Sequence, residues 1–190
     1  MRIVGGTSSG IPLRVPDNGV RPTSDRVREA LFSILGEFVL GASCVDLFAG
    51  SGSLGIEALS RGAKSCIFVD RTRDSCEAIL LNLKKAKLIG GTVRKGEVES
   101  LLGKINGEHK LVFADPPYNV HGSVSIVEQL AKSDKLVRLL LPGGILVLES
   151  SKSDVDFPCH QEINLLNVRE YGDSQLILYR RDTNIKNNGI

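Results

Sequence analysis

The chain has 190 residues, of which 42% are hydrophobic and 24% charged, with a formal net charge of +2. This length suits one domain that buries about 70% of its unfolded surface, and so small a charge does not by itself indicate nucleic-acid binding. The four cysteines have no C-x-x-C spacing and no histidine partner, which favours a reduced cytoplasmic protein over a zinc site or a disulfide framework. Because the sequence has neither a long apolar run nor the apolar centre of a signal peptide, we expect no membrane span and no secretion.

The start of the chain differs from the rest. Two short apolar stretches, residues 2–4 and 11–15, flank a glycine-rich segment. This pattern predicts a β-hairpin or an extended arm. We therefore expect an N-terminal arm over residues 1–22, an α/β domain over residues 23–181 and a frayed tail over residues 182–190.

A helix is predicted after Pro22, because residues 23–25 are good helix caps and apolar side chains then recur on one face. Arg21, Arg26 and Arg28 lie at its start, where the helix dipole disfavours cations. A solvated helix surface would explain them, but arginines gathered at the unfavourable end favour an anionic partner.

Residues 44–59 combine an apolar run, an acid, a glycine-rich turn and helix-forming residues, which predicts a strand, a loop and a helix. Gly50, Gly52 and Gly55 fit the spacing G-x-G-x-x-G of nucleotide-binding loops. Glycines let the backbone approach a ligand closely, and a helix N-terminus offers free N–H groups. The spacing alone does not distinguish a dinucleotide site, an S-adenosylmethionine site and a structural turn.

Strands and helices alternate through the remaining chain. The longest predicted helix begins near residue 72 and is expected to bury Cys76, Ile79, Leu80 and Leu83. A further helix is expected over residues 125–140. Strands are expected at residues 65–70, 92–95, 110–115 and 145–149, followed by a closing hairpin at 163–166 and 175–180. This order predicts an α/β, Rossmann-like fold: a doubly wound, mostly parallel seven-stranded sheet, with helices on both faces and an antiparallel hairpin at one edge.

Four acidic residues stand at or just past predicted strand ends: Asp46, Asp70, Glu97 and Asp115. In a doubly wound sheet these ends meet at one crevice. Asp70 is placed to accept hydrogen bonds from both hydroxyls of a ribose, and it would repel the 2′-phosphate of NADP. Asp46 suits a cationic or amino-bearing ligand and would repel a pyrophosphate, which favours S-adenosylmethionine over NAD. Glu97 could meet an adenine or cap a short helix.

The segment Asp115-Pro116-Pro117-Tyr118 follows a predicted strand. Two consecutive prolines give a stiff loop with free carbonyl groups beside the expected crevice. A planar base could stack on Tyr118 while its amino group donates to the Asp115 carboxylate and the Pro116 carbonyl. Such a site would position an amine for methyl transfer, and Asp115 could receive the released proton. A plain proline-rich turn is the alternative.

These motifs resemble the RsmD-type 16S rRNA guanine-N2 methyltransferases, a family of class I S-adenosylmethionine-dependent enzymes, from residue 1 to about residue 180. The most particular match is R-P-T-x-D-R-V-R-E at residues 21–29, since the glycine loop and D-P-P-Y occur in many amino-methyltransferases. The other matching segments are residues 1–6, 46–55, 57–63, 115–118 and 171–173.

The resemblance implies methylation of one guanine of 16S rRNA at its exocyclic N2, with S-adenosylmethionine as donor, S-adenosylhomocysteine as product and no metal. The implied partner is 16S rRNA in the small ribosomal subunit or an assembly intermediate, and we expect a monomer. The residues expected to bind the cofactor are Asp46, Phe48, Ala49, Gly50, Ser51, Gly52, Asp70, Arg71, Glu97 and Asp115. The expected catalytic residues are Asp115, Pro116, Pro117 and Tyr118. The residues expected to contact RNA are Arg2, Arg14, Arg21, Thr23, Arg26 and Arg28.

One departure from the family pattern concerns the tip of the predicted hairpin. The family usually carries basic residues after Gly5-Gly6, where this chain has Thr7-Ser8-Ser9. The arginines rather than the tip are therefore expected to contact RNA.

Three other functions fit parts of the sequence. D-P-P-Y would also serve an adenine-N6 or cytosine-N4 amino-methyltransferase acting on DNA or RNA. The glycine spacing would serve an NAD-dependent dehydrogenase, although Asp46 and D-P-P-Y oppose it. An RNA-binding scaffold without activity is the remaining alternative, and an intact Asp115–Tyr118 segment disfavours it.

Overall fold

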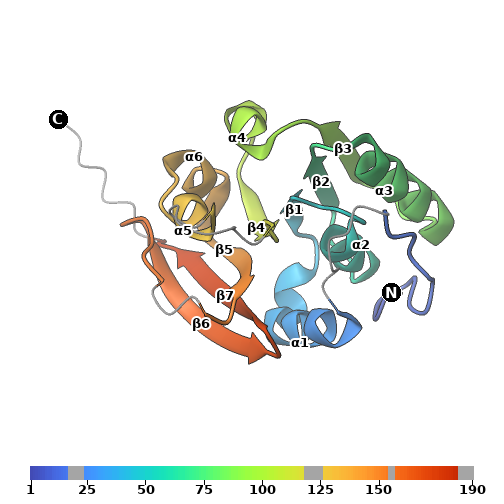
Figure 1. Ribbon diagram of the computed structural model, residues 1–190, viewed down its shortest axis with the longest axis horizontal. Helices are drawn as coiled ribbons and strands as arrows, with labels where there is room; N and C mark the ends of the chain where they lie inside the picture. Colours follow the sequence, from blue (N-terminus) through green and yellow to red (C-terminus); the bar gives the residue numbers. More distant parts are fainter. Residues whose placement is uncertain (17–23, 118–125, 154–156, 184–190) are drawn as a thin grey trace.

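The computed structural model describes residues 1–16, 24–117, 126–153 and 157–183. Its centre is a seven-stranded sheet in the order β3-β2-β1-β4-β5-β7-β6 (Figure 1). Strands β1 to β5 are parallel, and β7 runs antiparallel to both β5 and β6. The strands are β1 Ser43–Leu47, β2 Ser65–Asp70, β3 Gly91–Lys95, β4 His109–Ala114, β5 Leu140–Ser151, β6 Ile163–Tyr171 and β7 Ser174–Arg181. The mostly parallel sheet expected from the sequence is confirmed.

Helices cover both faces of the sheet because side chains alternate along the buried strands. In β4, Phe113 belongs to one apolar core and Val112 to the other. The first core lies under α1 Asp25–Leu35, α2 Ser53–Ser60 and α3 Arg73–Ala86. The second lies under α4 Val98–Leu101, α5 Ile126–Ala131 and α6 Asp134–Val137 (Figure 1). Two short 3-10 helices, Gly36–Val39 and Leu102–Lys104, follow α1 and α4.

The helix ends follow local cap chemistry. The side chain of Ser24 accepts a hydrogen bond from Val27 N at the start of α1, and Thr72 caps α3 in the same way. The single helix predicted over residues 125–140 is instead two helices, α5 and α6, because a second N-cap interrupts it. Ser133 accepts from Leu136 N and starts α6 as a separate helix.

The closing hairpin lies at one edge of the sheet, as predicted. β7 is inserted beside β5, and β6 forms the outer edge. β5 begins at Leu140, before the predicted start at residue 145, and its pairing with β4 shifts between His109 and Leu111.

The N-terminal arm is docked on the domain. Its two halves meet at a single antiparallel bridge between Arg2 and Pro12, and Ile3 N donates to Ile11 O at 2.9 Å. Ile3 and Leu13 are buried and belong to the first core, together with residues of α1, α2 and α3. The arm is thus a hairpin-like layer over those helices, and its predicted end at residue 22 lies outside the described residues. Within the described part of the chain, no helix is both long and apolar enough to span a membrane.

Candidate active site

The loop after β1 has an unusual backbone. Phe48, Gly50 and Gly52 all have positive φ angles, of 58°, 54° and 77°. Glycine adopts this conformation freely, whereas Phe48 is strained in it. The turn brings Phe48 to the carboxyl edge of the sheet and starts α2 immediately after Gly52.

Asp46 lies beneath this loop and supports it. Its Oδ2 accepts a hydrogen bond from Gly55 N at 2.9 Å, and the residue is 2% exposed. The pKa of this carboxyl is raised to about 8, mainly by burial; the hydrogen bond from Gly55 N opposes the shift, and the nearby charges of Asp115 and Asp70 contribute to it. Asp46 does not line the pocket described below, so in this structure it acts on a ligand only through the loop.

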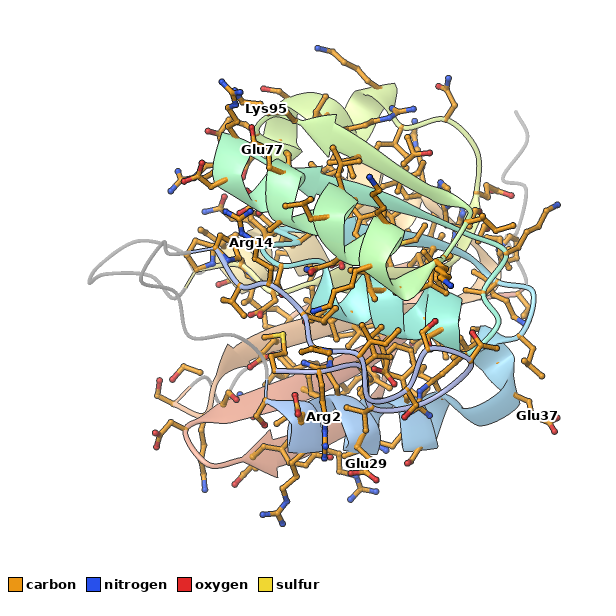
Figure 2. All side chains as sticks on the ribbon, turned by 90° about the vertical axis from the view of Figure 1, so that its right-hand side faces the viewer. Arg2, Arg14, Glu29, Glu37, Glu77 and Lys95 are labelled. Atoms are coloured by element: carbon orange, nitrogen blue, oxygen red, sulfur yellow. The ribbon has the colours of Figure 1, made fainter. Side chains whose placement is uncertain are left out.

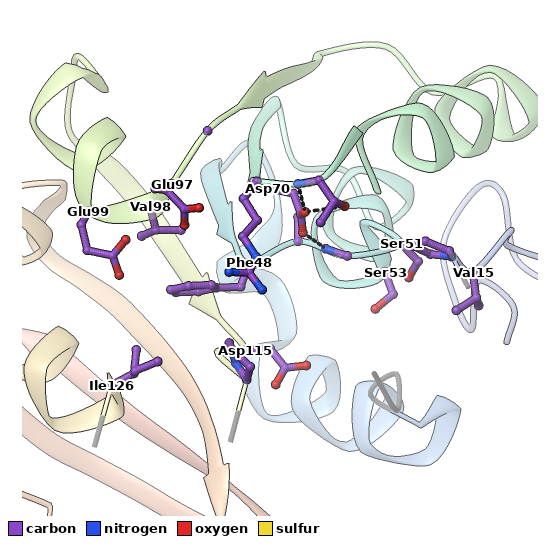
Figure 3. Close-up of a pocket in the computed structure, with 17 residues that line it drawn as sticks. Val15, Phe48, Ser51, Ser53, Asp70, Glu97, Val98, Glu99, Asp115 and Ile126 are labelled. Atoms are coloured by element: carbon purple, nitrogen blue, oxygen red, sulfur yellow. Dashed lines mark hydrogen bonds between the residues drawn. The ribbon is translucent and has the colours of Figure 1, made fainter. Parts of the chain in front are cut away.

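Asp70 ties the loop to the end of β2. Its Oδ2 accepts from Gly50 N at 2.8 Å, and its Oδ1 accepts from Thr72 N at 2.9 Å and Thr72 Oγ1 at 3.1 Å (Figure 3). Both carboxylate oxygens therefore have partners already. A carboxylate accepts about four hydrogen bonds, so Oδ2 keeps the capacity for another donor.

A pocket of about 290 Å³ opens at the carboxyl ends of the parallel strands. Most of the expected cofactor residues line it: Phe48, Ala49, Gly50, Ser51, Asp70, Arg71, Glu97 and Asp115, with Pro117 of the predicted catalytic segment. Gly52 and Pro116 do not line it. Gly52, at the end of the loop, faces α3 instead, and an added Cβ there would contact Ile79 at 3.0 Å.

Other lining residues carry no signal in the sequence. Val15 and Pro16 reach the pocket from the N-terminal arm, and Ile126 reaches it from α5. Their places depend on where distant segments dock, which no local pattern specifies. The remaining members of this group are Ser53, Thr72, Gly96, Val98 and Glu99.

The charges around the pocket are mostly negative. Asp70, Glu97, Glu99 and Asp115 contribute four carboxylates, and Arg71 is the one basic side chain among its described lining residues. Figure 3 shows Glu97 and Glu99 on one side of Phe48 and Asp115 on the other. Such a lining favours a cationic or amino-bearing ligand and repels a phosphate-rich one.

The acidic turn after β4 joins the same pocket. β4 ends at Ala114, so Asp115 follows directly, half-buried, and Pro117 is exposed. Asp115 and the glycine loop therefore share one cavity, as the sequence predicted for strand ends of this fold. Tyr118 lies outside the described residues.

The arginines expected to contact RNA do not share one environment. Figure 2 shows Arg2 beside α1 and Arg14 at the far end of the arm; both are exposed, as is Arg26. Arg28 is fully buried, and it donates to Arg2 O and to Asp25 Oδ1. Its expected RNA contact is therefore wrong for this structure, because its position falls on the buried side of α1. Arg21 and Thr23 lie outside the described residues.

The buried charge of Arg28 belongs to an ionic cluster under the arm. Glu57 in α2 is 0% exposed, and its two carboxylate oxygens accept from Val4 N at 2.8 Å and Gly5 N at 2.7 Å. Arg61 Nε donates to Glu57 Oε1 at 2.7 Å, and Arg28 Nε lies 4.0 Å from Oε2. This cluster attaches the start of the arm to α1 and α2.

Within the described ranges, no histidine or cysteine lines the pocket. Among the residues the structure describes, no three His, Cys, Asp or Glu side chains form a group that could hold a metal ion. Cys44, Cys66, Cys76 and Cys159 are free thiols, and burial raises the pKa of Cys44 to about 12.

The strand order, the glycine loop after β1 and the acids at the ends of β2 and β4 define a Rossmann-like methyltransferase fold. Residues 1–180 match the family model described as "Conserved hypothetical protein 95". The chain belongs to this family, the RsmD type of rRNA methyltransferase proteins.

Individual relatives agree with this placement. The chain is 42% identical over 119 residues to ribosomal RNA small subunit methyltransferase D of Escherichia coli, an alignment covering 62% of this chain and 60% of that protein. It is 32% identical over 187 residues to YlbH of Bacillus subtilis, covering 95% and 99% of the two chains. The solved structure of yhhF from Escherichia coli superposes with a TM-score of 0.81 at 32% identity, over 97% of this chain and 99% of that one.

Proposed function

We propose that this protein transfers a methyl group from S-adenosylmethionine to the exocyclic N2 of a guanine in 16S rRNA. The observation that carries the proposal is the single pocket in which the glycine loop and Asp70 meet Asp115 and Pro117. A donor site and an amine-binding turn are thereby joined in one cavity. The name of the Escherichia coli relative, a small subunit rRNA methyltransferase, supports the choice of RNA.

The residues of the pocket fit this cofactor. S-adenosylmethionine supplies an electrophilic methyl group on a sulfonium, and it also carries an amino group. Four carboxylates around the pocket complement these cations, whereas they would repel the pyrophosphate of NAD. Oδ2 of Asp70 can accept from a ribose hydroxyl, and Glu97 can accept from the adenine amine.

The acceptor amine would lie at Asp115. Its carboxylate can accept one N–H of the guanine amino group, and we expect the Pro116 carbonyl, which does not line the pocket in this structure, to accept the other when the base binds. Because the amine lone pair is delocalised into the ring, both contacts serve to orient the nitrogen and favour its tetrahedral form. Asp115 can then receive the proton that the nitrogen loses. Stacking of the base on Tyr118 remains a prediction.

RNA would approach along the exposed arginines of the arm and α1. Arg2, Arg14 and Arg26 can contact phosphates, and specific recognition would require a base presented from an unstacked loop. The tip of the arm is unsuited to phosphate binding, since Thr7 N and Ser8 N are bonded to Ser60.

The test is methyl transfer from labelled S-adenosylmethionine to small-subunit particles and to naked 16S rRNA, followed by mass spectrometry of the nucleosides. We expect N2-methylguanosine. An adenine-N6 or cytosine-N4 product would instead show the alternative amino-methyltransferase. No transfer to any substrate would refute the proposal.

A further inference from the structure

Asn82 connects two parts of the molecule that are distant in sequence. This α3 residue is 1% exposed, and its side chain forms three hydrogen bonds. Oδ1 accepts from Arg14 N at 2.8 Å, and Nδ2 donates to Arg14 O at 2.9 Å. The second Nδ2 hydrogen serves Ser51 O at 2.9 Å. The Asn82 amide is therefore hydrogen-bonded both to the backbone of the N-terminal arm and to the backbone of the glycine loop.

The arm also forms a wall of the pocket at this point. Val15 and Pro16, which follow the Arg14 held by Asn82, line the pocket together with Ser51. Met1 adds a second contact, because Ser51 Oγ lies 3.5 Å from its Sδ. If the arm left α3, the pocket would lose this wall, and the Asn82 amide would lose the two bonds to Arg14 that orient it toward Ser51 O.

We propose that Asn82 is a positioning residue that couples the arm to the cofactor loop, so that a ligand bound at either place strengthens binding at the other. The inference rests on the proposed function, which supplies the two ligands: S-adenosylhomocysteine in the pocket and 16S rRNA on Arg2 and Arg14 of the arm. Both favour the docked arm, and linkage makes their effects on one another equal.

The test compares Asn82→Ala with Lys85→Ala, a matched control on the same helix. Lys85 Nζ also holds the arm, because it donates a hydrogen bond to Pro12 O at 2.8 Å, but it has no bond to the glycine loop. Affinity for S-adenosylhomocysteine is measured by calorimetry with and without 16S rRNA. We expect RNA to raise this affinity at least about fivefold in the unchanged protein and in Lys85→Ala. In Asn82→Ala we expect RNA to leave the affinity for S-adenosylhomocysteine nearly unchanged. Without RNA, we expect this variant to bind S-adenosylhomocysteine about tenfold more weakly than the unchanged protein does.

Hydrogen exchange on the unchanged protein provides a measurement that needs no variant. Addition of S-adenosylhomocysteine should slow exchange of the Arg14 amide, whose partner is Asn82, and RNA should slow exchange in residues 50–52. This measurement decides the matter if Asn82→Ala does not fold.

Two results would overturn the coupling. One is an unchanged RNA effect in folded Asn82→Ala, and the other is an Arg14 amide indifferent to S-adenosylhomocysteine. Failure of the proposed function looks different, because the unchanged protein would then methylate no RNA. Active methyl transfer without mutual strengthening would refute this inference alone.

Discussion

Among single residues, Asp115 is the one on which the proposed chemistry depends. We expect Asp115→Ala to reduce methyl transfer at least about 100-fold, because the amine loses its acceptor and its proton-receiving group. Affinity for S-adenosylhomocysteine should stay within about threefold, since the glycine loop and Asp70 are untouched. Single-turnover kinetics and calorimetry measure the two quantities. Full activity in this variant would show that Asp115 does not serve the amine.

Asp46 makes stability depend on pH. Its folded-state pKa of about 8 lies above the ordinary value of 3.8, so the folded protein binds this proton more tightly than the unfolded chain does. The resulting stabilisation is complete below about pH 4 and is lost as the pH rises through about 8. Asn at this position can still accept from Gly55 N and does not titrate.

We therefore expect the free energy of unfolding of Asp46→Asn, relative to the unchanged protein, to rise by about 1–3 kcal/mol between pH 5 and pH 8. Urea denaturation at both pH values measures the difference. A constant difference would mean that Asp46 is ionised throughout this range.

At the scale of elements, the arm depends on a close approach to α2. Gly6 has a φ of 79°, and an added Cβ would overlap the carbonyl of Ser60. Gly10 has a similar φ of 85°, but nothing lies within 4 Å of its added Cβ. We expect Gly6→Ala to lower the free energy of unfolding by about 3 kcal/mol and Gly10→Ala by about 1 kcal/mol. Equal losses, by denaturant titration, would show that the arm does not pack closely on α2.

The ionic cluster under the arm gives a second comparison. Glu57→Gln leaves Arg28 and Arg61 without their buried counter-charge, so we expect a loss of about 3 kcal/mol. Glu77 pairs with Arg73 on the exposed side of α3, and Glu77→Gln should cost less than about 0.5 kcal/mol. Thermal unfolding of both variants measures the contrast. A small effect at Glu57 would mean that the arm is held by its apolar contacts and its other hydrogen bonds rather than by the ionic cluster.

The elements themselves were largely predictable, and their exceptions have local causes. The strands that flank the site were expected because apolar runs end in acids there. Leu80 was expected to be buried but is 56% exposed, whereas Asn82 is buried instead. Hydrophobic periodicity assigns polar residues to the outside, so it misses a polar side chain buried by hydrogen bonds to a distant arm.

For the molecule as a whole, the sequence predicted the part of the pocket formed by the strand ends better than the part formed by the N-terminal arm. Strand ends converge in this fold, so Asp70, Glu97 and Asp115 could be placed together from their spacing. Val15 and Pro16 could not, because their position follows from the docking of the arm on α3. The RNA contact predicted for Arg28 is wrong for a related reason: charge at a helix start indicates an anion, but here the anions are the protein's own Asp25 and Glu57.

The whole molecule should distinguish the two cofactors through its stability. A ligand that binds only the folded state stabilises it by about 2.7 kcal/mol at 100 times its Kd. For a chain of this size that corresponds to a Tm increase of about 5–10 °C. We expect S-adenosylhomocysteine to produce this shift in thermal unfolding and NAD to produce none, because the carboxylates around the pocket repel a pyrophosphate. Stabilisation by NAD and not by S-adenosylhomocysteine would show that the glycine loop binds a dinucleotide. The proposed methyl transfer at Asp115 would then have no methyl donor.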